Sequence, residues 1–372
     1  MASRSGTNLE FDVPPPPDDG GIDALALGRL TTARYNAFLS NMESRNAAIL
    51  EVLEQSRNAL TARIGTANLK RFREFSRTER ASNYGLGSLA HDERAPARLA
   101  AARRASAAQA AKLMQEANLK PSDLRPLNSA LLQRVSEINA RTSRGKGRLE
   151  VVSEAQVPAR VLKGNPYTVR KPPFDGWEWW YSWWWDGFGD DPEFIHYTNS
   201  QSGSVGHRSQ WEVWDAGGWD FYTLSVHSSV GFWLKPAKAG KLDLWIKNRC
   251  GGARYKVYWY DEAGWSDFGD NMFSSWTVNL SSGTSDEDET PMWEMHFNGP
   301  NDEEKTLSGD IVPPNTVGWL HMTTSDAIPA NVWTYVKIGT YDTHQMLSDD
   351  VSLDSIMKNR WYFEEVHYDT LD

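Results

Sequence analysis

The segment from Gly176 to Asp191 reads GWEWWYSWWWDGFGDD and packs six tryptophans and one tyrosine into nine consecutive residues. Because side chains alternate between the two faces of a β-strand, an extended segment here has one wholly aromatic face and one mixed face. The aromatic face comprises Trp177, Trp179, Tyr181, Trp183 and Trp185. Burying every indole ring with its N–H satisfied is demanding. We therefore expect part of this aromatic face to be covered by an assembly partner or by a ligand.

Composition divides the chain at this segment. All 18 tryptophans lie at or after Trp177. Upstream of it, Ala, Leu, Arg and Glu dominate, and these residues lose little rotamer freedom in helices. Downstream, Trp, Tyr, Val, Thr and Gly are typical of strands and turns. The sequence therefore predicts a helical region followed by an all-β region.

The β region contains about ten strand-like segments separated by Gly, Asp, Asn, Ser and Pro, with no long helical period between them. In KLDLWIK, for example, Leu242, Leu244 and Ile246 fall on one face. Such spacing predicts an antiparallel sandwich of jelly-roll type. The expected fold is α+β and multidomain. Its parts are a disordered Pro-rich arm (1–21), a helical assembly region (22–145), a linker (146–175) and a Trp-rich β-sandwich (176–372).

The first helical segment carries a heptad seam. Leu39, Asn46, Leu53 and Leu60 recur every seven residues, and a second series with the same period lies between them. This pattern predicts either a coiled coil that makes a homo-oligomer or one side of an intramolecular helical bundle. The residues expected to mediate oligomerisation are Tyr35, Leu39, Met42, Ile49, Leu53 and Leu60.

Charge is distributed unevenly along the chain. The formal net charge is −10, yet residues 1–160 carry an excess of Lys and Arg over Asp and Glu. RFREFSRTERAS, from Arg71, interleaves cations with two phenylalanines, an arrangement that binds single-stranded nucleic acid. Glu74 and Glu79 lie among them, and such mixed charge is more typical of a solvated helix face with i,i+4 ion pairs. Nucleic acid is therefore a partner that we consider but do not favour.

Cysteine usage and the N-terminus limit the compartment. The single cysteine, Cys250, excludes an intrachain disulfide, and nothing around it indicates a catalytic nucleophile. The first thirty residues contain VPPPPDDGG where a signal peptide needs an apolar region. No apolar stretch approaches the roughly 18–20 residues of a membrane span. We expect a protein that is cytoplasmic, or assembled in the cytoplasm and then released.

Three segments share tryptophan, carboxylate and glycine in close succession, namely WWWDGFGDD, WDAGGWD and GWSDFGDN. Indole faces stack on the apolar faces of sugars while Asp and Asn accept from their hydroxyls, so these segments predict a ligand site. The alternative is that they are ordinary turns. The candidate ligand-binding residues are Trp183, Trp185, Asp186, Asp190, Asp191, Trp214, Asp215, Trp219, Trp265, Asp267, Asp270 and Asn271. The sequence has neither the spacing of a calcium loop nor an HExxH motif, so no metal, cofactor or catalytic residue is predicted.

These features favour a non-catalytic structural protein, such as a particle component or lectin-like module, that displays an aromatic sandwich for adhesion or for binding a ligand such as a glycan. Three alternatives stay open. A capsid-type shell protein would bind nucleic acid in a salt-dependent way through its basic helices. A carbohydrate-active enzyme would place two carboxylates across a cleft. A toxin-like protein would rearrange its helical part at a membrane.

Overall fold

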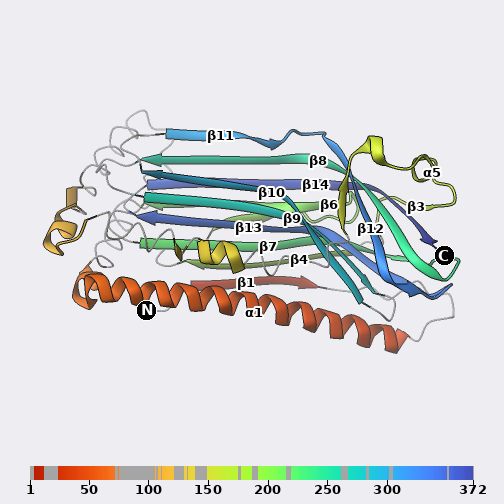
Figure 1. Cartoon of the computed structure of the whole chain (residues 1–372), viewed down its shortest axis with the longest axis horizontal. Coiled ribbons are helices and arrows are strands. Elements are labelled where there is room, and N and C mark those ends of the chain that lie inside the picture. The colour runs from red at the N-terminus through yellow and green to blue at the C-terminus, as the bar shows by residue number, and fades with distance from the viewer. Residues whose placement is uncertain are drawn as a thin grey trace.

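The computed structural model describes residues 4–11, 24–71, 74, 105, 108–109, 111–120, 130–131, 133–138, 149–174, 177–186, 192–214, 219–260, 267–281, 285–300, 305–349 and 352–371. These residues form two antiparallel sheets packed face to face, with the long helix α1 (Ala24–Ile64) running alongside β1 and β4 (Figure 1).

The first sheet, sheet A, runs in the order β1, β4, β7, β13, β9, β10. Its strands are β1 (Arg4–Phe11), β4 (Trp177–Asp186), β7 (Trp219–Leu234), β13 (Thr334–Asp349), β9 (Asp267–Ser281) and β10 (Ser285–Pro300). Sheet B runs in the order β2, β12, β8, β14, β6, β5, with β11 paired to β8 and β3 paired to β14. Its strands are β2 (Glu150–Val152), β12 (Val317–Ile328), β8 (Gly240–Tyr260), β14 (Ser352–Leu371), β6 (Ser204–Trp214), β5 (Glu193–His196), β11 (Lys305–Val312) and β3 (Thr168–Arg170).

All pairings between these strands are antiparallel, which confirms a predominantly antiparallel β-sandwich. The jelly-roll connectivity stays a prediction.

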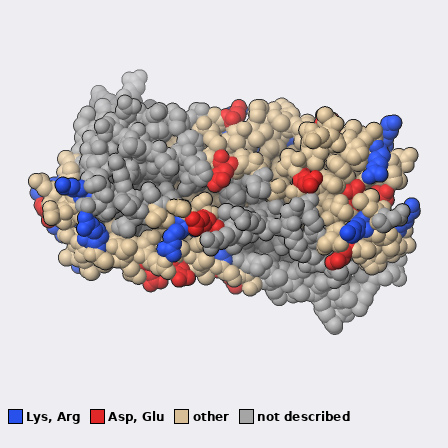
Figure 2. All heavy atoms as spheres, viewed as in Figure 1, with Lys and Arg blue, Asp and Glu red and all other residues tan. Residues whose placement is uncertain are grey.

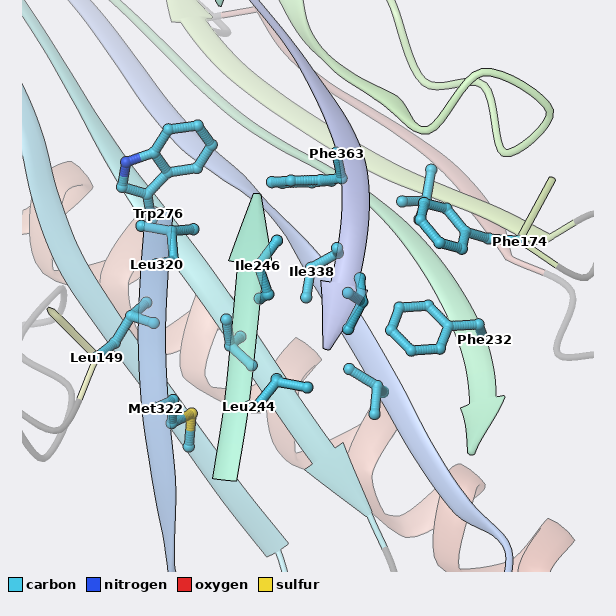
Figure 3. Close-up of a cluster of buried hydrophobic side chains, with 14 of the residues drawn as sticks. Leu149, Phe174, Phe232, Leu244, Ile246, Trp276, Leu320, Met322, Ile338 and Phe363 are labelled. Atoms are coloured by element: carbon cyan, nitrogen blue, oxygen red, sulfur yellow. The ribbon is translucent and has the colours of Figure 1, made fainter. Parts of the chain in front are cut away.

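The two sheets enclose an apolar core (Figure 3). Leu244 and Ile246 of β8 point into it, as the alternation of KLDLWIK predicts. Phe232 and Ile338 of sheet A meet them from the opposite side. A second apolar cluster lies between the same two sheets, and its buried members are Trp211, Tyr222, Leu224, Val226, Val257, Met272, Met346 and Met357.

The tryptophan-rich segment forms β4, and its two faces separate as the alternation predicts. Trp184 is opposite Leu224 and packs inside the sandwich, whereas Tyr181 and Trp183 are on the other face. Both of these rings are buried, and Asn46 of α1 donates a hydrogen bond from Nδ2 to the Tyr181 hydroxyl at 3.2 Å. The aromatic face therefore lies towards α1.

Part of the heptad seam of α1 is buried by contacts within the chain. Ile49 is fully buried and Leu53 nearly so in the single chain, and the Arg45 guanidinium lies 4.2 Å from the centre of the Tyr341 ring on β13. The side chains of Ile49 and Leu53 are thus unavailable to a second copy. Asn46 and Arg45 in this part of α1 contact Tyr181 and Tyr341 of sheet A, so both the coiled coil and the helical bundle stay predictions. Leu60 packs with residues of the neighbouring helical segments. The side chains of Tyr35, Leu39 and Met42 lie outside the described residues, and oligomerisation stays a prediction.

Two of the predicted boundaries differ from the structure. Residues 4–11, expected in a disordered arm, form β1 and pair with β4, because an edge strand of sheet A has hydrogen-bonding groups free to pair. The expected linker (146–175) is part of the sandwich. It contains β2, the 3-10 helix η3 (Glu154–Gln156), α5 (Ala159–Leu162) and β3. Val157, Val161 and Tyr167 are buried in it against two tryptophans of sheet B, and this apolar contact is what fixes it there.

Candidate functional site

The sequence-predicted ligand segments converge in space at one end of the sandwich. Trp185 and Asp186 end β4, Trp214 ends β6, and Trp219 begins β7. Asp267 begins β9, and Asp270 and Asn271 follow it in the same strand. Asp349 at the end of β13 is opposite Trp219, and the preceding residue is opposite Phe268, so β7 and β9 start at the same end of sheet A.

Trp183 is the member of this set whose side chain the structure describes. Its ring is 5% exposed and belongs to the interior, not to a surface that could stack on a sugar. Asp190, Asp191, Asp215 and Trp265 lie outside the described residues. The ligand role of the remaining residues stays a prediction.

A second candidate surface, which sequence reasoning missed, lies on the outer face of sheet B. Lys358 on β14 is directly opposite Arg208 on β6 and Arg254 on β8, so three cations form one row across three adjacent strands. Their buried neighbours, Ser209 and Met357, point into the sandwich, so the three cations point outward. Like charges directly opposite each other destabilise a sheet, so packing alone does not explain this row.

The next outward position on β14 is Arg360. Its cross-strand partners are Gly206 and Gly252, neither of which has a side chain. At Gly206, where φ is +117°, an added Cβ would lie 1.9 Å from the carbonyl oxygen of Asn359. Only glycine fits there, so neither cross-strand neighbour places a side chain beside Arg360.

Two tyrosines complete this surface. The Arg360 guanidinium lies 4.9 Å from the ring centre of Tyr197 and 5.0 Å from that of Tyr362. The Arg249 guanidinium lies 4.6 Å from the same Tyr362 ring. Cations and rings therefore alternate, and each cation–π contact fixes the position of a guanidinium group. We call this surface the cationic face; it consists of Tyr197, Arg208, Arg249, Arg254, Lys358, Arg360 and Tyr362.

The carboxylates near the cationic face neutralise only part of it. Glu364 pairs with Arg249 at 2.6 Å, and Asp310 pairs with Arg254. Within the described residues, no carboxylate lies within ion-pair distance of Lys358 or Arg360. The Nε atom of Arg360 is moreover buried without a hydrogen-bond partner. Arg208, Lys358 and Arg360 therefore have no carboxylate partner among the described residues.

A buried carboxylate on the same face of sheet B has a structural role. Asp243 accepts hydrogen bonds from the Tyr167 hydroxyl (2.5 Å), the Trp245 indole N–H (3.1 Å) and His321 Nε2 (2.7 Å). Burial acts to raise the pKa of Asp243, but these donors more than offset it and hold the pKa below its ordinary value. Burial, followed by the hydrogen bond to Asp243, raises the pKa of Tyr167. Since Tyr167 comes from residues 149–174 and the acceptor from β8, this cluster fastens that segment to sheet B.

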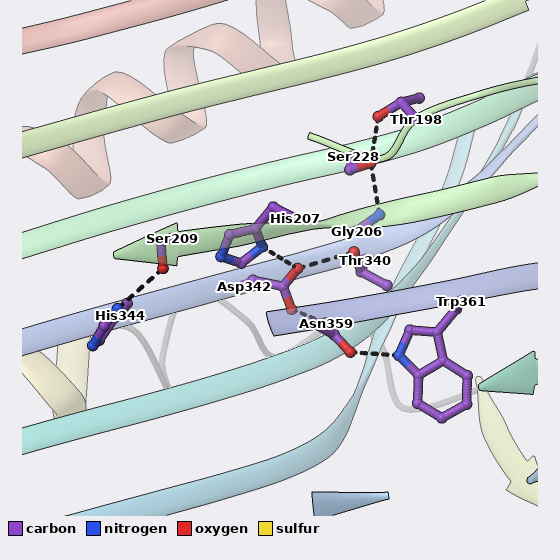
Figure 4. Close-up of polar contacts among 10 residues, drawn as sticks. All are labelled: Thr198, Gly206, His207, Ser209, Ser228, Thr340, Asp342, His344, Asn359 and Trp361. Carbon is purple, nitrogen blue, oxygen red and sulfur yellow. Dashed lines mark hydrogen bonds and ion pairs between the residues drawn. The ribbon is translucent and has the colours of Figure 1, made fainter. Parts of the chain in front are cut away.

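A second polar cluster is fully enclosed between the sheets (Figure 4). Asp342 accepts from His207 Nδ1 at 3.0 Å, from Asn359 Nδ2 at 2.7 Å and from the Thr340 hydroxyl at 3.1 Å. Asn359 in turn accepts from the Trp361 indole N–H. Apart from His207 Nε2, which has no partner among the described residues, these groups satisfy one another. They are enclosed by the two sheets, and their hydrogen bonds link Asp342 of sheet A to His207 and Asn359 of sheet B.

Other reactive groups among the described residues give no catalytic or metal site. Burial raises the pKa of the Cys250 thiol, which disfavours the thiolate form that acts as a nucleophile. No cluster of three or more His, Cys, Asp or Glu side chains with metal-binding geometry occurs in the described part of the chain. A search of the described helices for one long and apolar enough to span a bilayer finds none.

Comparison with known proteins adds the following findings. No protein-family model and no curated protein matches the sequence. Among solved structures, a carbohydrate-binding module (TmCBM61) in complex with beta-1,4-galactotriose aligns with a TM-score of 0.13 at 6% identity, covering 44% of this chain and 88% of that chain. The C-terminal family 22 carbohydrate-binding module of Clostridium thermocellum Xyn10B aligns with a TM-score of 0.13 at 12% identity, covering 43% and 84%.

The enzymatically active domain of bacteriophage CBA120 tailspike protein 4 aligns with a TM-score of 0.14 at 7% identity, covering 48% of this chain and 19% of that chain. Scores this low establish neither a common fold nor a common ligand. The function of the cationic face is therefore inferred from its own contacts and charges.

Proposed function

We propose that this protein is a non-catalytic binding protein whose β-sandwich holds a glycan on the cationic face. The observation that carries the proposal is the alternation of Arg249, Tyr362, Arg360 and Tyr197, all half-buried, on the outer face of sheet B. Guanidinium groups held against rings present their N–H donors in fixed directions, and tyrosines offer both ring edges and hydroxyls. Sugar hydroxyls need such donors and acceptors, with little loss of conformational freedom on binding.

The cationic face favours binding over catalysis. Glycoside hydrolysis needs two carboxyl groups facing each other across the scissile bond. The described acids at this face, Glu364 and Asp310, are each engaged by an arginine. Neither is free to act as a general acid, because each already accepts a charge-assisted hydrogen bond from a guanidinium group.

Glycan-array binding followed by calorimetry on a positive glycan tests the proposal. Tyr362→Ala and Tyr197→Ala remove the rings that position the guanidinium groups, and we expect at least a tenfold loss of affinity from each. Trp333→Ala is the matched control, because this half-buried ring contacts Lys235 away from the cationic face. If the two tyrosine variants stay folded and bind as the wild type does, the cationic face is not the glycan site.

The second part of the proposal is that the helical region assembles several copies of the chain, each of which displays its sandwich. Light scattering on the full-length chain, with and without residues 1–150, tests it. A monomer at tens of micromolar, about the range in which modest interfaces saturate, would remove the assembly role.

A further inference from the structure

We infer that the cationic face selects acidic glycans, whose sugars carry carboxylate groups, over neutral ones. This inference rests on the proposed glycan-binding function and names the ligand class. It follows from the row of Arg208, Lys358 and Arg254, and from the positions of the Lys358 amine and the Arg360 guanidinium beside the Tyr197 ring.

The row of three cations costs stability in the free protein. Lys358 has a cation opposite it on both neighbouring strands, and strands lie about 4.8 Å apart, so the three charges repel. Among the described carboxylates, one pairs with this row, namely Asp310 with Arg254. Arg208 donates to the neutral amide oxygen of Gln210 at 2.6 Å. A bound carboxylate would relieve the repulsion and accept charge-assisted hydrogen bonds, which a neutral sugar cannot do to the same extent.

The position of Lys358 suits such a contact. Its ammonium group would lie 3.5 Å from a Cβ added at Gly252, and it lies 6.0 Å from the ring centre of Tyr197. The amine therefore extends along β14 towards Arg360 and lies over Gly252, which has no side chain. The Lys358 amine and the Arg360 guanidinium thus both lie near the Tyr197 ring, and we expect one carboxylate bound beside this ring to contact both.

The amount of charge favours a glycan over a nucleic acid. A nucleic acid has one phosphate per nucleotide and binds extended, uncompensated basic tracts. Here Glu364 and Asp310 neutralise two of the five cations, and the whole chain has a net charge of −10. Acidic and basic side chains are also intermixed on the described surface seen in Figure 2. A local group of unpaired cations on an acidic protein matches isolated carboxylates better than a dense polyanion.

The test compares charged and uncharged forms of the same polymers. Full-length protein is titrated with polygalacturonate and with polysialic acid, each beside its methyl-esterified form, and with single-stranded DNA. We expect the acids to bind at least tenfold more tightly than the esters, with an advantage that shrinks as salt is added. Lys358→Met should remove about tenfold of this advantage and also raise Tm by about 1–3 °C, because it relieves like-charge repulsion. Lys238→Met, on the exposed turn between β7 and β8, is the charge-matched control and should change neither quantity.

Each other outcome overturns part of the argument. Equal affinity for acid and ester at a Tyr362-dependent site leaves the proposed function standing and refutes the inference. Absence of binding to either form, together with a negative glycan array, refutes both. Binding of DNA as tight as that of the acids shows a general polyanion surface and refutes the glycan class. A Lys358→Met variant that is folded, less stable than the wild type and unchanged in binding shows that the row of cations is structural.

Discussion

Removing the hydroxyl group of Tyr167 tests whether the buried Asp243 cluster fastens residues 149–174 to sheet B. A hydrogen bond to a charged group contributes about 1.5–3 kcal/mol to stability. In Tyr167→Phe, the Asp243 carboxylate keeps its bonds from Trp245 and His321 and a longer one from Thr323, so it is not left unsatisfied. We therefore expect a loss from the lower half of that range, about 1.5–2 kcal/mol in the free energy of unfolding. For a folded unit of roughly 200–250 residues, this corresponds to a fall in Tm of about 3–8 °C.

Urea unfolding of wild type and Tyr167→Phe, followed by tryptophan fluorescence, measures this loss. The difference in the free energy of unfolding between the two proteins should also depend on pH. Because the folded pKa of Asp243 is lowered, its stabilisation is complete above the unfolded value of about 4 and is lost as the pH falls through the folded pKa. The difference between the two proteins should therefore be full at pH 7 and shrink below about pH 4.

The matched control for this experiment is Tyr341→Phe. Its hydroxyl is also buried but donates to the neutral Ser225 hydroxyl at 3.1 Å, and such a bond contributes only about 0.5–1.5 kcal/mol. If Tyr167→Phe costs no more than Tyr341→Phe, or if its cost is the same at pH 7 and pH 3, the charge-assisted account of the Asp243 cluster is wrong.

Three further predictions concern the rest of the sandwich. Burial lowers the pKa of His227 well below its ordinary value, so below about pH 6.5 the unfolded chain binds a proton that the folded chain does not. The free energy of unfolding of the wild type should therefore fall with acidification by up to about 1.4 kcal/mol per pH unit more than that of His227→Gln, as measured by urea unfolding between pH 5 and 6.5. Gly339→Ala would place a Cβ 2.2 Å from the carbonyl oxygen of Ser228 on the adjacent strand, so we expect a loss of more than about 2 kcal/mol, and an unchanged Tm would contradict this packing. The Cys250 thiol is buried, so a thiol reagent should label it only at the rate of unfolding, and immediate labelling of the native protein would show that β8 opens locally.

The division of the chain into helical and β parts follows from the sequence. Alternation is a local property of the backbone, so KLDLWIK could be oriented without knowledge of its neighbours, and Leu244 and Ile246 are in the core as expected. The separation of Tyr181 and Trp183 from Trp184 on β4 was predictable for the same reason.

Only the tertiary structure shows which residues cover the heptad face of α1 and the apolar residues of 149–174. A heptad seam is the same pattern in a coiled coil between chains and in a bundle within one chain, so the sequence left both open for Ile49 and Leu53 and did not predict packing on a sheet. The burial of these residues in the single chain follows from α1 packing within the chain, with Arg45 and Asn46 reaching rings on sheet A. The segment 146–175 seemed to be a linker because Pro and Gly interrupt it repeatedly. Only the tryptophans on sheet B provide the surface against which its apolar residues are buried.

The cationic face shows the same limit for function. Arg208, Arg254 and Lys358 are distant in sequence, and each alone resembles an ordinary solvated residue of a strand. The sequence determined that each points away from the core, through the period of two. Their assembly into one row depends on the pairing of β14 with β6 and β8, because register between strands is set by long-range hydrogen bonding and core packing.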